Sequence, residues 1–135
     1  MKLLLDTHII IWALTDDPRL SRKARELLSS PDNVILYSVA SLWEIAIKNK
    51  KAPEKCPYHE KEIMEYCDRA GFLSLDIKAV HILSLRDLRI KPDQYLSNHD
   101  PFDRMILCQA KAEGCMMLSH DHAFLCYDEP CIVMV

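Results

Sequence analysis

Short, continuous apolar runs alternate along the chain with longer segments of helical periodicity. Each run is about four residues long, and the runs fall at 2–5, 34–37, 72–75, 115–118 and 132–135. Continuous apolar runs of this length are typical of parallel strands whose two faces are both covered. Because helical segments separate the runs, the pattern predicts an α/β fold, an α/β/α sandwich with a central parallel sheet of four to five strands.

Capping residues and helix breakers predict where the intervening helices begin and end. The predicted helices cover residues 8–15, 21–29, 40–49, 59–70, 77–88 and the segment between Asp100 and Gly114. The last helix has the clearest start, with Asp100 as N-cap and Pro101 in the first turn, and Gly114 ends it. Ser38 or Ser41 is expected to cap the third helix, and Ser41 and Glu44 have the spacing of a capping box.

The helix predicted at 77–88 has an apolar side that we expect to be buried. Ile77, Val80 and Leu83 lie on or near that side. A polar loop is predicted over residues 89–99. At 135 residues and 50% hydrophobic, with no repeat or linker, residues 1–135 are expected to fold as a single domain.

Charge and cysteine content narrow the class of protein. The net charge of −3 argues against nucleic-acid binding by bulk electrostatics, so any such contact has to come from local basic clusters. The six cysteines form no CxxC pair and lie mostly in apolar segments, which favours reduced core residues of a cytoplasmic protein. Asp6 and His8 interrupt the apolar opening, so we expect neither a signal peptide nor a membrane span.

Four acidic residues lie just after predicted strands or in the helices that follow them. They are Asp6, Glu44, Asp103 and Asp121. Ligands bind beyond the carboxyl ends of strands in a parallel sheet, so these side chains are expected to converge. Four carboxylates repel one another without a cation, and such oxygen ligands suit Mg²⁺, with Mn²⁺ as an alternative. The sequence therefore predicts a catalytic metal site for phosphate chemistry.

Each acid also has an ordinary structural explanation. Asp103 interrupts an otherwise apolar helix face, but an acid in the first turn also interacts favourably with the helix dipole. Glu44 shares a stripe with Lys48, and a solvated face with an ion pair explains it nearly as well. Asp6 can be a turn residue, and Asp121 can be an ordinary loop aspartate.

The histidines and tryptophans indicate no further site. No HxxxH pair or Cys/His set completes a zinc site, and surface or loop hydrogen bonding is predicted for His99, His120 and His122. Trp12 and Trp43 are expected to be core or interface residues rather than platforms for base stacking.

Four segments form an ordered set that spans nearly the whole chain. They are LLLDTH at 3–8, SVASLWEIAIK at 38–48, HDPFDRMILCQAKAEG at 99–114 and LSHDHAF at 118–124. Together they resemble the signatures of PIN-domain proteins, specifically the VapC-like toxins of toxin–antitoxin pairs. Thr7 and Ser38 stand where relatives often use a hydroxyl to orient ligands. The fourth segment departs mildly, because many relatives carry threonine or serine before a polar residue there.

The resemblance implies a Mg²⁺-dependent endoribonuclease with the PIN fold. Asp6, Glu44 and Asp103 match the three core acidic ligands, and Asp121 matches the more variable fourth. The implied reaction is hydrolysis of RNA phosphodiester bonds by water activated at the cation, with no protein nucleophile. The resemblance also implies a cognate antitoxin protein and a homodimer.

Other classes of protein stay open as alternatives. The strongest is a receiver-like, Mg²⁺-binding phosphoacceptor domain without nuclease activity, because Asp76 follows the third predicted strand. That chemistry needs a lysine near the last strand, and the chain has none after Lys111. An aspartyl phosphatase would need an acid where His8 stands, and a dinucleotide-binding module would need a Gly-rich loop. A structural partner protein is the remaining alternative if the acids lie apart.

Overall fold

A five-stranded sheet forms the centre of the computed structural model, which describes residues 1–94 and 100–135. All neighbouring strands are parallel, in the spatial order β3-β2-β1-β4-β5. The strands are β1 (Lys2–Leu5), β2 (Val34–Ser38), β3 (Leu73–Leu75), β4 (Met116–Ser119) and β5 (Ile132–Met134). The predicted parallel sheet is confirmed.

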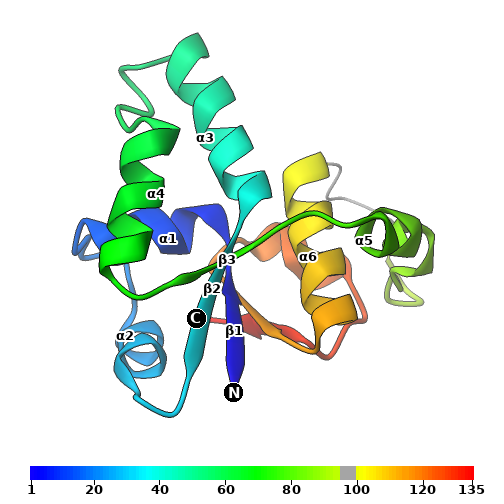
Figure 1. Ribbon diagram of the computed structural model, residues 1–135. Helices are drawn as coiled ribbons and strands as arrows, with labels where there is room; N and C mark the ends of the chain where they lie inside the picture. Colours follow the sequence, from blue (N-terminus) through cyan, green and yellow to red (C-terminus); the bar gives the residue numbers. More distant parts are fainter. Residues whose placement is uncertain (95–99) are drawn as a thin grey trace.

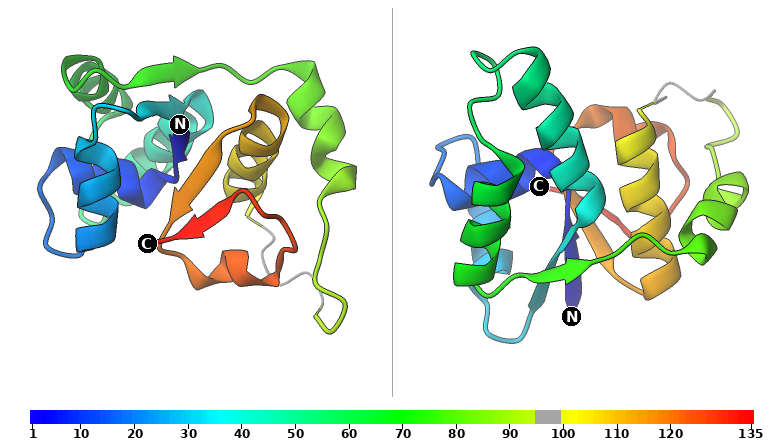
Figure 2. Two further views of the ribbon diagram at one scale, coloured as in Figure 1. Left: turned by 90° about the horizontal axis from the view of Figure 1, so that it is seen from below. Right: turned by 45° about the horizontal axis from the view of Figure 1, so that its top comes forward.

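Helices cover both faces of this sheet. They are α1 (Thr7–Leu14), α2 (Arg22–Ser29), α3 (Val39–Lys51), α4 (Glu60–Arg69), α5 (Ala79–Leu83) and α6 (Pro101–Glu113), with 3-10 turns η1 (Ser84–Asp87) and η2 (His122–Cys126). Figure 1 shows the sheet nearly edge-on, with α1, α2 and α4 on one side and α5 and α6 on the other. Figure 2 shows the same two layers from below and from above. The α/β/α sandwich is therefore confirmed.

The core is divided between the two faces of the sheet. Leu3 and Leu5 pack with Ile9 of α1 in one cluster, whereas Leu4 packs with Ile106 of α6 in the other. Successive strand residues point to opposite faces, so a strand covered on both sides buries every apolar residue. Burial of each such side chain stabilises the fold by about 1.5–3 kcal/mol. The continuous apolar runs in the sequence reflect this double coverage.

The start and end of α6 follow the predicted capping pattern. The Asp100 carboxylate accepts hydrogen bonds from the backbone N–H of Phe102 (2.9 Å) and Asp103 (3.0 Å). Pro101 occupies the first turn, where its missing N–H costs nothing. Gly114 ends the helix with φ +67°, a left-handed conformation that glycine adopts without strain.

Of the two N-caps predicted for the third helix, Ser38 is confirmed, whereas Ser41 with its capping box to Glu44 is wrong. The N-cap of α3 is Ser38, whose hydroxyl accepts a hydrogen bond from the N–H of Ala40 at 3.0 Å. Ser41 lies inside the first turn and is buried, so its hydroxyl faces the interior instead of the helix end. The local spacing was compatible with two starts, and the strand end at Ser38 selects the earlier one.

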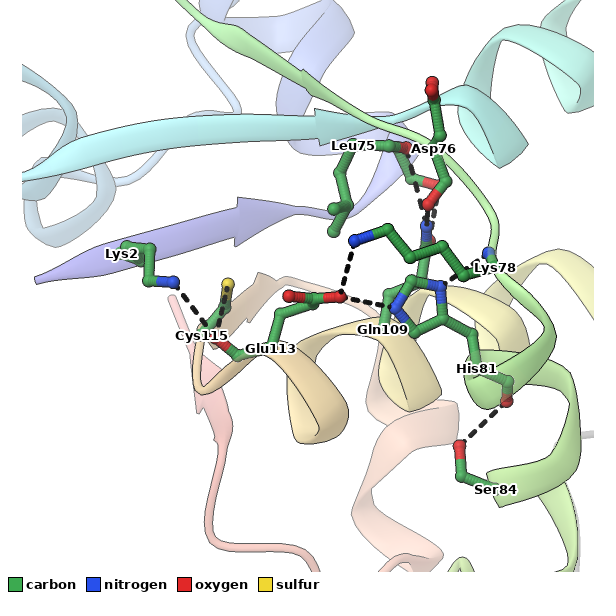
Figure 3. Close-up of polar contacts among 10 residues, drawn as sticks. Lys2, Leu75, Asp76, Lys78, His81, Ser84, Gln109, Glu113 and Cys115 are labelled. Carbon is green, nitrogen blue, oxygen red and sulfur yellow. Dashed lines mark hydrogen bonds and ion pairs between the residues drawn. The ribbon is translucent and has the colours of Figure 1, made fainter.

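The helix predicted over 77–88 is also different. It is shortened to α5 and η1, and Val80 and Leu83 on its expected inner side are 55% and 74% exposed. His81 is buried instead, because its Nδ1 accepts a hydrogen bond from the N–H of Lys78 and its Nε2 lies 2.8 Å from Glu113 Oε1 (Figure 3). Pairing with α6 therefore outweighs the apolar periodicity of this segment.

Other expectations concern cysteines, membrane spans and the polar loop. All six cysteines are free, as predicted. None of the helices in the described part of the chain has the length and apolar character needed to cross a bilayer. The final residues of the predicted polar loop, 95–99, lie outside the described residues, and so does the surface role predicted for His99.

Candidate active site

Asp6 lies at the carboxyl end of β1 and is the N-cap of α1. Its Oδ1 accepts a hydrogen bond from the N–H of His8 (3.0 Å), and its Oδ2 accepts one from the hydroxyl of Ser119 at the end of β4. Asp6 is only 3% exposed. From β1 the sheet continues through β2 to β3 on one side, and from β4 it continues to β5 on the other side. Parallel sheets bind ligands in the crevice at the carboxyl ends of two such central strands, and Asp6 lies there.

Glu44 extends from α3 toward the same crevice. It is 4% exposed, which excludes the alternative explanation as part of a solvated helix face, although the ion pair with Lys48 in that explanation is present. Thr7 Oγ1 lies 2.7 Å from Glu44 Oε1 and 2.9 Å from Ser41 Oγ. Since a hydroxyl carries one proton and a carboxylate only accepts, Thr7 donates to Glu44 and receives the Ser41 proton. These contacts hold the Glu44 carboxylate in one orientation.

The ionised form of Asp6 is disfavoured in this crevice. Burial raises the pKa of Asp6, and the nearby charge of Glu44 raises it further. Hydrogen bonds from Ser119 and the His8 backbone lower this pKa, but the net direction is upward. The ionised form of Asp6 is therefore incompletely compensated, and a bound cation would complete the compensation.

Lys48 connects these acids electrostatically to the start of α6. Burial lowers the pKa of Lys48, but the hydrogen bond and charge of Glu44, with the charges of Asp100 and Asp103, outweigh burial and raise it. The ammonium group is thus held charged between α3 and the first turn of α6. Asp103 is half-buried and lies within the field of this ammonium group.

Asp103 and Asp121 are the other two predicted ligands. In residues 1–94 and 100–135, no three His, Cys, Asp or Glu side chains lie close enough to hold a metal ion. Asp121 is exposed, and its Oδ1 accepts a hydrogen bond from the N–H of Ala123 (2.9 Å), which fits the alternative of an ordinary loop aspartate that caps the following turn, η2. The convergence of Asp103 and Asp121 with Asp6 and Glu44 around one ion stays a prediction.

Sequence reasoning missed Ser119 as a site residue. Its hydroxyl contacts Asp6, and its oxygen accepts a hydrogen bond from the N–H of Asp121 at 3.0 Å. A hydroxyl residue ending a buried strand beside β1 was the available signal, but only the strand order makes it informative. Ser38 Oγ, by contrast, donates to Gln109 rather than to any of the four acids.

Aromatic rings gather beside Asp6. His8 stacks on Trp12 with ring centroids 5.9 Å apart, and His120 meets Trp12 edge-on at 5.4 Å. Trp12 is 8% exposed, which confirms its core position, whereas Trp43 is 60% exposed, which excludes the core and leaves the interface position that was the other part of the prediction. His120 is exposed, and its Nδ1 lies 2.6 Å from the Val135 carbonyl oxygen, in line with the predicted surface role.

The strand order disfavours the receiver-like alternative. Receiver-type folds of the flavodoxin-like class have the order 2-1-3-4-5. The order here is β3-β2-β1-β4-β5, and β3 is an edge strand, so Asp76 after β3 lies at the edge of the sheet. The phosphoacceptor position of that fold has no equivalent at the central crevice.

Several solved structures are similar in fold. VapBC2 from Rickettsia felis bound to a promoter DNA fragment matches with TM-score 0.68 and 20% identity, covering 100% of this chain and 98% of that chain. DNA-bound VapBC from Salmonella typhimurium matches with TM-score 0.64 and 20% identity, covering 100% and 97%. A toxin–antitoxin complex from Klebsiella pneumoniae matches with TM-score 0.61 and 22% identity, covering 97% and 95%.

Sequence comparison gives the family directly. No curated protein matches the chain significantly. The PIN domain model, however, matches residues 3–129, which include Asp6, Glu44, Asp103 and Asp121. The resemblance seen in the four segments is thereby confirmed over almost the full length. This chain belongs to the PIN domain family.

Proposed function

We propose that this protein is a Mg²⁺-dependent endoribonuclease that acts as the toxin of a toxin–antitoxin pair. The observation that carries the proposal is the buried pair of carboxylates, Asp6 and Glu44, at the central crevice of the sheet. Buried like charges are costly unless a counter-ion compensates them. Mg²⁺ is commonly held by one or two carboxylates, several waters and substrate phosphate, so this donor pair fits it, and Mn²⁺ has similar preferences.

Each residue of the site has a proposed role. Asp6 and Glu44 would hold the cation, with Asp103 on α6 as the third core ligand and Asp121 as the more variable fourth. When bound, the cation activates water and neutralises phosphoryl charge. Ser119 keeps Asp6 oriented through the hydroxyl contact.

Two neighbours of Glu44 complete the proposed machinery. Thr7 donates a hydrogen bond to Glu44 Oε1 and so presents the other carboxylate oxygen toward Lys48. Lys48 is half-exposed and held charged, so its ammonium group is available to a phosphate of the RNA strand.

The proposal includes partners. A cognate antitoxin is supported by the similar solved structures, which are described as VapBC or toxin–antitoxin complexes. A homodimer is supported by exposed apolar side chains on α3 and α5, namely Trp43, Ile82 and Leu83, because monomers rarely expose such groups together. A cytoplasmic location is supported by the six free cysteines.

Cleavage assays with purified, antitoxin-free protein test the reaction. We expect structured RNAs to be cut with Mg²⁺ or Mn²⁺, and Asp6→Asn and Glu44→Gln to be inactive. Asp32→Asn is the matched control, because Asp32 is an exposed acid just before β2, at the opposite end of the strands. Cleavage that persists in Asp6→Asn or in excess chelator would contradict the proposal.

Calorimetric titration tests the metal separately from the reaction. Mg²⁺ or Mn²⁺ is expected to bind the wild type and Asp32→Asn, and to bind Asp6→Asn and Asp103→Asn much more weakly. Equal binding to all four proteins would instead favour a structural partner protein whose acids form no site.

A further inference from the structure

A cavity of about 600 Å³ opens beside the buried carboxylates. Its lining residues come from α1, the C-terminal half of α3 and the segment that leads to α4. Figure 1 shows where these elements lie. Thr7 and Lys48, the two hydrogen-bond donors to Glu44, form part of its wall, so the cavity is continuous with the candidate active site. Its volume falls in the range of roughly 300–1,000 Å³ that ligand pockets span.

Cations dominate the charged groups of this wall. The charged lining residues are Asp17, Arg19, Lys48, Lys51 and Lys55. Asp17 is paired with Arg19 at 2.8 Å, and Lys48 is paired with Glu44. Lys51 and Lys55 are exposed, and neither forms an ion pair with any residue in the described ranges. Two uncompensated cations in one cavity of a chain with net charge −3 indicate an anionic ligand.

The same cavity has an accessible flat ring. His8 and Trp12 both line it, and their rings stack 30° from parallel. Trp12 is almost fully buried and also lies under the Arg19 guanidinium, 4.9 Å from the ring centroid, so it holds its neighbours in place. His8 is exposed and presents its imidazole to the cavity. Rings beside cations are how proteins bind single-stranded nucleic acid, with bases stacked on the rings and phosphates at the cations.

We propose that this cavity is the subsite for the RNA strand adjoining the scissile phosphate. Backbone phosphates lie against Lys51 and Lys55, and one base stacks on His8. The assignment of this strand as substrate rests on the proposed function. An RNA strand brings one negative charge per nucleotide, which matches the two uncompensated lysines and the ring together.

Binding of a fluorescein-labelled, ten-nucleotide single-stranded RNA tests the lysines. Fluorescence anisotropy is measured in chelator over a range of salt concentrations, so cleavage does not interfere. Each phosphate contact to a single strand contributes about 0.7 to the slope of log K against log salt. Lys51→Ala and Lys55→Ala are each expected to reduce the slope by about that amount. Lys50→Ala is the matched control, because Lys50 is exposed on the same helix but does not line the cavity.

The ring is tested with two substitutions at one position. His8→Ala is expected to weaken RNA binding roughly fivefold to a hundredfold, the range that base stacking on a side chain spans. His8→Phe keeps a flat ring and is expected to restore most of the binding. Thermal unfolding of every variant checks that these exposed positions leave the fold intact.

The outcomes separate this subsite from the proposed function. Equal salt slopes for Lys50→Ala, Lys51→Ala and Lys55→Ala would overturn the subsite, even if metal-dependent cleavage is found. RNA binding that depends on Lys51 and Lys55 supports the subsite, even if no cleavage is detected. Loss of antitoxin binding in these two variants with unchanged RNA binding would overturn the proposal and assign the cavity to the protein partner.

Discussion

A comparison of two clusters of buried polar side chains in the described part of the chain shows a difference in how their charges are compensated. In the cluster between β3, α5 and α6, His81 accepts from the Lys78 N–H at Nδ1 and therefore donates from Nε2 to Glu113 (Figure 3). Gln109 accepts from the Ser38 hydroxyl and donates to the Asp76 carbonyl. Donors and acceptors match throughout this cluster.

The crevice at Asp6 and Glu44 has the opposite character. Both carboxylates are hydrogen-bonded, but they are like charges, and burial raises the pKa of Asp6. The hydrogen bond from His81 instead lowers the pKa of Glu113. A buried cluster whose charges are compensated by its own members indicates a structural role. A cluster that holds a carboxylate with a raised pKa indicates a binding site. Three substitutions and the pH dependence of stability test this contrast.

The largest effect is expected from Asp6→Asn. RNA cleavage should fall more than about 100-fold, beyond the loss typical of residues that only support metal ligands. Stability should rise by about 0.5–2 kcal/mol at neutral pH, because asparagine keeps the helix cap and removes the strained charge. Cleavage rates and urea unfolding measure the two effects. A variant that is both inactive and less stable would indicate that Asp6 is structural.

Gln109→Leu is expected to act on stability alone. The substitution removes the hydrogen-bond partner of the buried Ser38 hydroxyl and of the Asp76 carbonyl. The free energy of unfolding should fall by about 1–3 kcal/mol for each of these groups that stays unsatisfied. Urea unfolding measures the total. Gln94→Leu is the control at an exposed position, where a change within about 0.5 kcal/mol is expected. Equal stability of the two variants would show that the α5–α6 cluster contributes little.

Ser119→Ala is expected to lower cleavage about tenfold with a smaller change in stability. Loss of its hydroxyl removes the hydrogen bond that lowers the pKa of Asp6 and orients its carboxylate. Ser84→Ala is the matched control, because Ser84 donates to the His81 carbonyl in the other cluster. If both serine variants cleave RNA equally well, Ser119 does not support Asp6.

The smallest effect is the pH dependence of stability, and its sign differs between the clusters. The pKa of Asp6 in the folded state lies above its ordinary value of 3.8. The folded state therefore keeps the Asp6 proton at pH values where the unfolded state has lost it, and stability falls as the pH rises from 3.8 toward the folded pKa. The folded pKa of Glu113 lies below 4.5, so its contribution is present above 4.5 and is lost as pH falls. The free energy of unfolding is measured against pH for Asp6→Asn and Glu113→Gln. Relative to the wild type, the two variants should change the slope of this plot in opposite directions. Slopes of the same sign would contradict the contrast.

Local patterns in the sequence predicted the type of fold and part of the site. The apolar runs predicted the strands because both faces of a parallel sheet are covered, and Asp100, Pro101 and Gly114 predicted α6 because caps act on neighbouring backbone groups. Asp6 was predicted as a crevice residue because strand ends meet at one edge of a parallel sheet.

Tertiary structure alone decided which polar groups are buried and what they contact. A solvated helix face was the alternative explanation for Glu44, but Glu44 is buried and accepts a hydrogen bond from Thr7, 37 residues away, and Asp6 accepts one from Ser119, 113 residues away. His81 is buried in place of the apolar residues predicted for that helix face, because it pairs with Glu113, 32 residues further along the chain. Periodicity within one helix carries no information about such distant partners. Burial and charge compensation depend on the strand order and packing that bring those partners together.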